Sequence, residues 1–297
     1  MNRFIIPILA VLVLIALLLL VLFTGPKTEN TASVTEPPTT AAPELPPVTM
    51  DLNLYCFQAG KADALLIWNE AGAVLIDTGV TGYGKTIVEK MTELGLERLD
   101  ALILTHFDND HVGGAKKVLI SFPVGTVYQS NYPRDSSAYE KYLKALTENN
   151  ITPVTVRETQ TFTLGDAVFT INAPKQEVYS EDPSNNSSLI VTVQHGENRI
   201  LLCGDAEDQR MTEFLQKDPG SCTLVKMPHH GAWQTTLTSL IEKTQPAWAL
   251  ITSSDEEPED PRTIELLTQN QVQCLLTRTA PILAVSDGKT LTVQYTE

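Results

Sequence analysis

Beyond residue 50, short apolar runs alternate with segments in which apolar residues recur every three or four positions. The short runs have the length of strands, and the spaced segments are typical of helices that bury one face. The pattern predicts strands at 52–57, 64–68, 73–76, 99–104, 124–128, 154–156, 161–164, 167–172, 189–194, 199–203, 248–252, 273–276 and 282–285, and helices at 86–94, 112–121, 136–149, 208–216 and 235–243. Two strand-rich halves that each carry helices indicate an α/β sandwich with the helices outside.

The first 50 residues follow a different pattern. Residues 4–23 are apolar throughout except for Pro7, and this is the length of one helical crossing of a bilayer. Arg3 precedes the span and only Lys27 follows it closely, which favours a cytoplasmic N-terminus and an exported remainder. We therefore predict an uncleaved signal anchor at residues 1–24 in the cell membrane, with a cleaved signal peptide as the alternative. Residues 25–49, rich in Thr and Pro, are predicted to be an extended linker to an extracytoplasmic domain at residues 50–297.

The charge and the cysteines restrict the function. A net charge of −15, from 36 acidic and 21 basic residues, argues against a broad basic surface for duplex nucleic acid. Cys56, Cys203, Cys222 and Cys274 form no Cys-x-x-Cys pair, so neither a zinc ribbon nor a thioredoxin-like motif is indicated.

Most of the histidines lie in two tight clusters. The first cluster contains His106, Asp108, Asp110 and His111, directly after a predicted buried strand and directly before Val112-Gly113-Gly114. Any one of these residues alone would be read as part of a turn or a helix cap. Imidazole and carboxylate groups at this spacing instead predict a divalent metal site.

Two further segments place polar residues just after an apolar run. Gly204-Asp205 follows the run 201–203, and Pro228-His229-His230-Gly231 follows the run 224–225. The ends of strands are where open α/β folds build their sites. We therefore expect the three segments to meet. His195, before Gly196, is predicted to be a surface residue in a hairpin turn.

Together these motifs resemble the metallo-β-lactamase-fold hydrolases, and specifically the branch represented by the C-terminal domain of ComEC competence proteins. The resemblance rests on residues 57–64, 76–79, 105–114, 185–189, 204–205 and 229–231. It implies a four-layered αββα sandwich over residues 50–297. It also implies two divalent metal ions, zinc or manganese, which act as Lewis acids that activate water for hydrolysis.

The resemblance also implies a role for each residue. His106 and Asp108 would hold one metal, Asp110, His111 and His229 would hold the second, and Asp205 would bridge both. Asp110 and His230 would be the catalytic side chains, the first orienting the attacking water and the second facing the substrate.

Some positions depart from the family pattern. Asp108 stands where typical members have a histidine, and no histidine precedes the strand that begins near Leu189. A first site that is richer in oxygen favours manganese over zinc and argues against β-lactam hydrolysis.

We therefore expect a membrane-anchored, extracytoplasmic, metal-dependent phosphodiesterase or nuclease. Its substrate would be a phosphodiester-containing molecule, including single-stranded DNA or a cell-envelope polymer, or another small extracellular compound. The membrane would be engaged through residues 4–23. The first alternative is a hydrolase of an extracellular ester, lactone or amide. The second is a non-catalytic anchored binding module on the same fold.

Overall fold

The computed structural model describes residues 48–296. The predicted anchor at residues 1–24 and residues 25–47 of the predicted linker lie outside the described residues, so both stay predictions. Within the part of the chain that the structure describes, no helix combines the length and the apolar character needed to cross a bilayer.

Two sheets form the centre of the domain. The first sheet has the strand order β15-β14-β1-β2-β3-β4-β5-β6, and the second has the order β13-β12-β11-β10-β9-β8-β7. The first contains β1 (Leu52–Cys56), β2 (Leu65–Asn69), β3 (Gly72–Ile76), β4 (Leu99–Leu104), β5 (Val124–Gln129), β6 (Val154–Thr155), β14 (Ile282–Ser286) and β15 (Leu291–Tyr295). The second contains β7 (Gln160–Leu164), β8 (Ala167–Asn172), β9 (Ile190–His195), β10 (Asn198–Leu202), β11 (Leu224–Lys226), β12 (Trp248–Ile251) and β13 (Gln273–Leu276).

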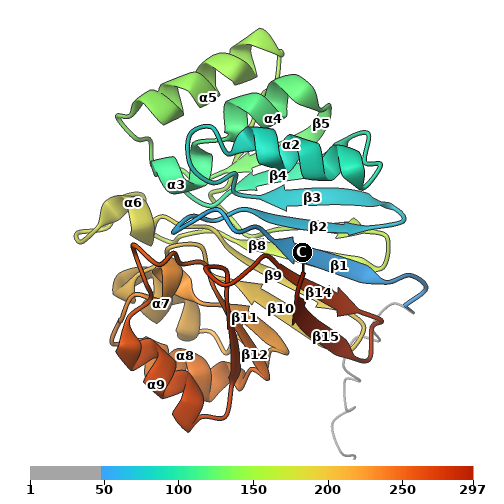
Figure 1. Cartoon of the computed structure of the whole chain (residues 1–297). Coiled ribbons are helices and arrows are strands. Elements are labelled where there is room, and N and C mark those ends of the chain that lie inside the picture. Colours follow the sequence, from blue (N-terminus) through green and yellow to red (C-terminus); the bar gives the residue numbers. More distant parts are fainter. Residues whose placement is uncertain (1–47, 297) are drawn as a thin grey trace, which may run out of the picture. The chain divides into compact units, whose positions relative to one another are not determined.

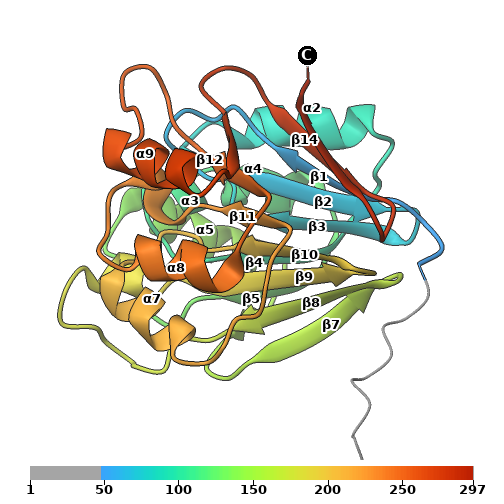
Figure 2. The ribbon, with the colours of Figure 1, turned by 90° about the horizontal axis from the view of Figure 1, so that it is seen from below.

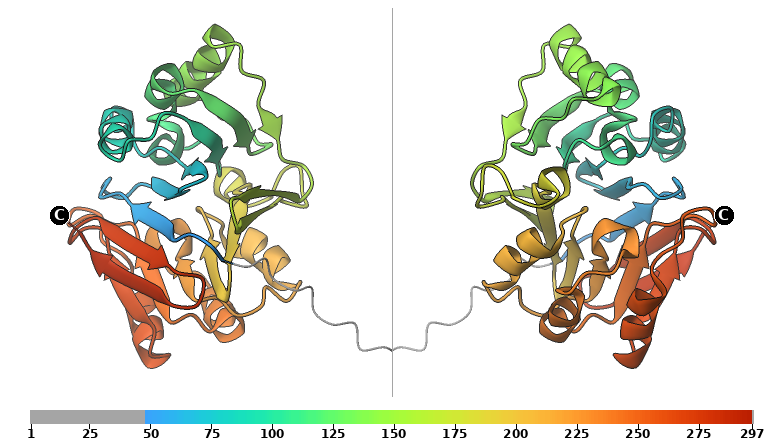
Figure 3. Two further views of the ribbon diagram at one scale, coloured as in Figure 1. Left: turned by 90° about the vertical axis from the view of Figure 1, so that its right-hand side faces the viewer. Right: turned by 90° about the vertical axis from the view of Figure 1, so that its left-hand side faces the viewer.

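Helices cover the outer face of each sheet, as Figures 1 and 3 show. On the first sheet lie α2 (Gly84–Glu93), α3 (Asn109–Val112), α4 (Ala115–Ser121) and α5 (Ser137–Glu148). On the second lie α7 (Asp208–Leu215), α8 (Leu237–Thr244) and α9 (Pro261–Gln269), which stand in front of that sheet in Figure 2. A single turn, α6 (Pro183–Asn186), lies between β8 and β9 in the sequence. The predicted four-layered sandwich is therefore confirmed.

Alternating side chains supply separate apolar cores. In β4, Ala101 and Ile103 belong to the core shared by the two sheets, whereas Leu102 and Leu104 pack with the helices of the first sheet. In β10, Ile200 lies in the shared core and Leu201 packs with the helices of the second sheet. Strands that are buried on both faces read as continuous apolar runs, and this is why the sequence identified them.

The parallel strands determine where a site can form. In the first sheet β3, β4 and β5 are parallel, and in the second β10, β11, β12 and β13 are parallel. Parallel strands end at the same edge of a sheet, so the loops that follow them lie close together.

The structure differs from the predicted elements at a few positions. The predicted helix at 112–121 is broken, because α3 ends at Val112 and α4 begins at Ala115. Helix α9 and the edge strand β15 were not predicted. The four cysteines are free thiols.

The prediction for His195 is wrong. The hairpin between β9 and β10 exists, but the imidazole is buried beneath the start of the domain and β14. Its Nδ1 lies 2.7 Å from the Ser286 hydroxyl and its Nε2 lies 3.1 Å from the Met50 carbonyl oxygen. His195 therefore fastens the beginning of the domain to the hairpin.

Candidate metal centre

The chemically active side chains lie just past the ends of parallel strands from both sheets. The loop after β4 carries His106, and the short helix α3 carries Asp110 and His111. Asp205 follows β10, and His230 lies in the 3₁₀ turn Pro228–Gly231 after β11. The three segments that the sequence singled out therefore meet at one place.

Two glycines let the first loop pack closely against its neighbour. A Cβ on Gly113 would lie 2.3 Å from the Thr81 amide nitrogen, and one on Gly114 would lie 2.3 Å from the Thr78 carbonyl oxygen. Both distances are far shorter than van der Waals contact, so only glycine fits at these positions. The close approach lets the Thr78 amide donate to the His111 carbonyl oxygen at 2.7 Å, which fixes α3 beside the strand end.

Four ligand atoms converge. One atom each from Asp110, His111, Asp205 and His230 lies within 4.8 Å of the others. Asp205 Oδ2 is 3.2 Å from His111 Nε2 and 3.1 Å from His230 Nε2, and Asp110 Oδ2 is 3.3 Å from His230 Nε2. His106 lies beside this group, with its ring centroid 4.1 Å from that of His111.

The imidazoles are oriented as metal ligands are. The Nε2 atoms of His106, His111 and His230 are buried, and those of His111 and His230 face the carboxylates of Asp205 and Asp110 at 3.1–3.3 Å. The other ring nitrogens are engaged: His111 Nδ1 is 2.8 Å from Asp77, and His230 Nδ1 is 2.8 Å from the Thr252 hydroxyl. Bonds of this kind fix the ring and direct the free nitrogen at a metal. This donor set therefore fits a divalent metal.

The protonation of the cluster reflects its charges. Burial alone would lower the pKa of His111, but Asp205 and Asp77 raise it well above its ordinary value. Burial alone would raise the pKa of Asp205, yet His111 and His230 hold it well below its usual range. Burial, together with the charge of His111, lowers the pKa of His106 to about 4. Burial alone would also lower the pKa of His230, but Asp205 and Asp110 raise it, so protons compete with a metal at His111 and His230 more than at His106.

A buried ion pair that the sequence analysis missed supports the cluster. The Lys226 ammonium pairs with Asp63, donates to the Gly204 carbonyl oxygen at 3.2 Å and lies 3.8 Å from Asp205 Oδ1. Asp63 in turn accepts a bond of 2.6 Å from Thr252, the partner of the His230 ring. The only signal in the sequence was a lysine that ends an apolar strand.

The geometry contradicts the predicted choice between the two adjacent histidines. His230, not His229, joins the clustered ligand atoms. His229 Nδ1 lies 3.0 Å from Glu207 Oε1, and its side chain is 27% exposed against 1% for His230. Both residues have positive φ, 47° and 53°, so the backbone curls tightly and the two rings have different surroundings. The sequence alone could not show which of the two histidines is the ligand, because they are consecutive residues.

Asp108 also lies outside the clustered atoms. Its carboxylate accepts a hydrogen bond from the Ser184 hydroxyl and lies 3.1 Å from Arg134 Nε. Of the two residues predicted to hold the first metal, His106 lies beside the clustered ligand atoms and Asp108 does not.

An open hollow gives access to the centre. It has a volume of about 670 Å³ and is lined by Asp108, Asn109, Asp110 and residues 132–136. Asp110 is 31% exposed whereas Asp205 is 4% exposed, so Asp110 faces both the cluster and the hollow.

Comparison with known proteins agrees with this geometry. The profile of the Metallo-beta-lactamase superfamily matches residues 58–251. ComE operon protein 3 of Bacillus subtilis (strain 168) is 28% identical over 250 residues, covering 73% of this chain and 31% of the relative. Recombination protein 2 of Haemophilus influenzae is 27% identical over 203 residues, covering 67% of this chain and 24% of the relative. The chain thus spans a third or less of the length of these curated relatives.

Solved structures share the fold. The metallo-beta-lactamase fold protein YhfI from Bacillus subtilis superposes with a TM-score of 0.51 at 12% sequence identity, covering 77% of this chain and 96% of that protein. Members of the superfamily are generally metal-dependent hydrolases that typically bind two divalent metals. The strand-end site and the matched profile lead to one conclusion: the chain belongs to the metallo-beta-lactamase superfamily, and within it the chain is similar to ComEC-like competence proteins.

Proposed function

We propose that this chain is a membrane-anchored, extracytoplasmic, metal-dependent phosphodiesterase. The observation that carries the proposal is the convergence of His111 and His230 with the carboxylates of Asp110 and Asp205, beside His106 and an open hollow. His106, His111, Asp205 and His230, with Asp110, would hold the metals. When bound, two divalent metals supply Lewis-acid activation of water and neutralise charge on the substrate.

Asp110 is the proposed proton acceptor. Burial alone would raise the pKa of its carboxyl, but its bond with His230 and the charge of His111 lower it below the ordinary value. The group is therefore ionised at neutral pH and accepts a hydrogen bond from a water in the hollow. His230 serves as a ligand and positions Asp110, in place of the substrate-facing role that the sequence suggested.

Arg134 supports an anionic substrate. Its side chain is 44% exposed at the hollow, and Nε and Nη2 face the Asp108 carboxylate, so the Nη1–Nη2 edge of the guanidinium is the part that would meet a substrate. A guanidinium matches the geometry of two phosphate oxygens and can bind them through parallel hydrogen bonds. In a chain with a net charge of −15, Arg134 shares its charge with Asp108, and the bound metals would supply most of the positive charge that a polyanion such as single-stranded DNA or a cell-envelope polymer needs.

The curated relatives point in the same direction. Recombination protein 2 and a further relative, Competence protein ComA of Neisseria gonorrhoeae, carry names that support a nucleic-acid substrate for this chain. Because the chain spans only a third or less of those proteins, the proposal covers hydrolysis at this site and not DNA uptake.

The test uses the purified full-length chain with manganese or zinc. We expect cleavage of bis-p-nitrophenyl phosphate or single-stranded DNA, and a loss of at least about 100-fold in Asp110→Asn. The exposed Asp51→Asn variant is the matched control and should retain full activity.

Two outcomes would overturn the proposal in different directions. Cleavage of p-nitrophenyl acetate without cleavage of phosphodiesters would establish the ester, lactone or amide alternative. A chain that retains well under two metals and cleaves neither class would be a binding module.

A further inference from the structure

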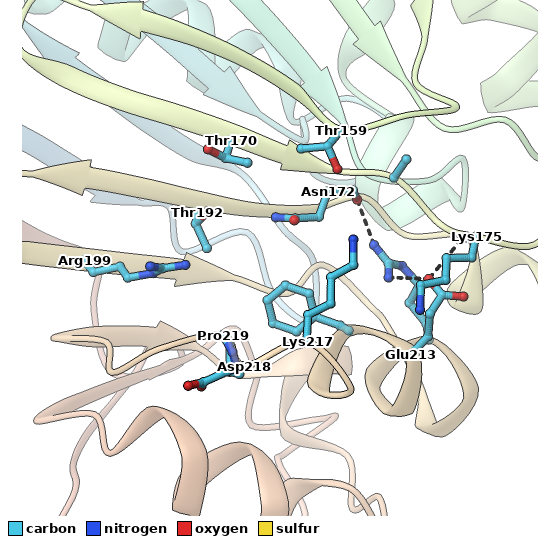
Figure 4. Close-up of a pocket in the computed structure, with 13 residues that line it drawn as sticks. Thr159, Thr170, Asn172, Lys175, Thr192, Arg199, Glu213, Lys217, Asp218 and Pro219 are labelled. Atoms are coloured by element: carbon cyan, nitrogen blue, oxygen red, sulfur yellow. Dashed lines mark hydrogen bonds and ion pairs between the residues drawn. The ribbon is translucent and has the colours of Figure 1, made fainter. Parts of the chain in front are cut away.

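A second hollow lies away from the metal centre, where the outer face of the second sheet meets the end of α7. It has a volume of about 220 Å³. Thr170 of β8, Thr192 of β9 and Arg199 of β10 line one side, and residues 213–214 and 217–219 line the other (Figure 4). Pockets for drug-sized ligands usually measure about 300–1,000 Å³, so this one suits a small ligand or one group of a larger molecule.

Positive charge gathers in this hollow. Lys175, Arg199, Arg210 and Lys217 all line it, although the chain as a whole carries a net charge of −15. The side chains of Arg199 and Lys217 extend toward the space between the strands and α7 (Figure 4). Such a concentration of one charge in a concave site raises the local concentration of ions of opposite sign.

The carboxylates at the hollow already have other partners. Glu213 accepts from Arg210 Nη1 at 2.8 Å, from the Tyr179 hydroxyl at 2.8 Å and from the Lys175 amide at 2.9 Å. Asp218 accepts from the Gly220 amide at 3.0 Å. Arg210 is fully buried and is neutralised by Glu213, so it shapes the wall and is not a free cation.

The other three cations have no acidic partner. Among residues 48–296, no carboxylate lies within 4.0 Å of the Lys175, Arg199 or Lys217 charged nitrogens. The bond that Lys175 Nζ makes is to the neutral Gln216 amide oxygen at 3.3 Å. Arg199 Nε is buried and has no hydrogen-bond partner, which is costly unless a ligand satisfies it. An acceptor is therefore missing at this position.

We propose that this hollow binds an anion of the phosphate class, either free or as the phosphate group of a larger molecule. Arg199 and Lys217 would contact the anion directly, and the Thr170 and Thr192 hydroxyls would donate hydrogen bonds to it. Lys175 would add a third positive charge at the edge of the hollow. A phosphate is favoured over a carboxylate because its oxygens point in several directions and can meet cations from both walls.

The hollow is separate from the metal centre but close to it. Arg210 forms its wall and donates from Nε to the Ser188 carbonyl oxygen at 3.1 Å. The Ser188 hydroxyl accepts from the Asp205 amide at 3.2 Å and lies 3.4 Å from His106 Nδ1. None of the residues that line the hollow is a proposed metal ligand, so binding of the anion can be tested independently of hydrolysis at the metal centre.

Binding is measured by isothermal titration calorimetry on the full-length chain. A chelator is present throughout, so that the metal centre does not capture the anion. Inorganic phosphate and glycerol 3-phosphate are titrated in parallel, against chloride at equal ionic strength. We expect saturable binding of one anion per chain. Equal affinities would identify free phosphate as the ligand, and tighter binding of the ester would identify a phosphate carried by a larger molecule.

Variants locate the site. Lys217 is exposed, and the Lys217→Gln variant should bind the anion about tenfold more weakly, because one charged hydrogen bond is lost. Arg199→Gln should weaken it at least as much. Lys116→Gln removes the same charge from an exposed position on α4 and should leave the affinity unchanged. Absence of saturable binding, or equal affinities in Lys217→Gln and Lys116→Gln, would overturn the proposal.

Discussion

Removing the buried lysine at the metal centre should destabilise the fold more than a loss of packing would. Lys226 is fully buried, and its ammonium is paired with Asp63, bonded to Gly204 and 3.8 Å from Asp205. Burial alone would lower the pKa of Lys226, but the two carboxylates raise it above its ordinary value, so it is charged. Lys226→Met keeps the chain length and removes only the cation.

The expected cost follows from the surroundings. Asp63 is 1% exposed, so without Lys226 its charge would be left in a site that excludes water. Breaking a buried pair by removing one partner typically costs about 3–5 kcal/mol. Changing Asp63 to Asn as well removes the unpaired charge, so the double variant should be more stable than the sum of the single variants by about 1–3 kcal/mol.

Urea unfolding in the presence of a chelator measures these differences, since bound metal would otherwise add to the stability. Lys85→Met is the matched control, because the Lys85–Glu89 pair is exposed and should contribute less than about 1 kcal/mol. The reasoning fails if Lys226→Met costs no more than Lys85→Met, or if the losses from Lys226→Met and Asp63→Asn simply add.

Three further predictions concern the centre and its opening. His230→Gln should lower metal content sharply while His229→Gln retains it, as measured by elemental analysis after gel filtration; equal retention would contradict the assignment. The pKa values of His111 and His230 are raised above 6.5, so the stability that their protonation gives the metal-stripped protein is present below pH 6.5 and is lost as the pH rises through the raised pKa values. Metal affinity should rise over the same range, and competition with a chelator from pH 6 to 9 checks both signs; a flat profile would refute them. Arg134→Gln should raise KM for a phosphodiester about tenfold, with little change in kcat, because it removes a bidentate contact to the substrate. Unchanged KM would place the substrate elsewhere.

The sequence predicted the elements whose pattern is local. The loop at 105–114 was found because an apolar strand, four potential ligand residues and two glycines follow one another closely. Helix α9 was not predicted, because it begins within a run of the sequence that is rich in Pro and acidic residues. In the structure Pro261 occupies the first turn, where its missing amide proton costs nothing, and Asp260 caps the helix by accepting from the Arg262 amide.

Contacts between distant segments could not be predicted in this way. Lys226 meets Asp63 only because β11 of one sheet ends opposite the loop between β1 and β2 of the other. The same holds for His195, which the pattern placed in a turn and the fold buried against Ser286. Each of these polar groups is satisfied by a partner that sequence spacing does not reveal.

The charge balance of the centre explains why it combines these groups. Asp63, Asp77, Asp110 and Asp205 bring four carboxylates together, and Lys226 compensates one of them permanently. The raised pKa values of the two imidazoles mean that protons can compensate two more. A divalent cation carries the same charge as those two protons and can replace them at the Nε2 atoms. Lys226 is not exchanged in this way, because its ammonium is fully buried and pairs with Asp63, which also accepts a hydrogen bond from Thr252. The lysine thus joins the two sheets at the site whatever occupies it, and the exchangeable positive charge is confined to the imidazoles of His111 and His230.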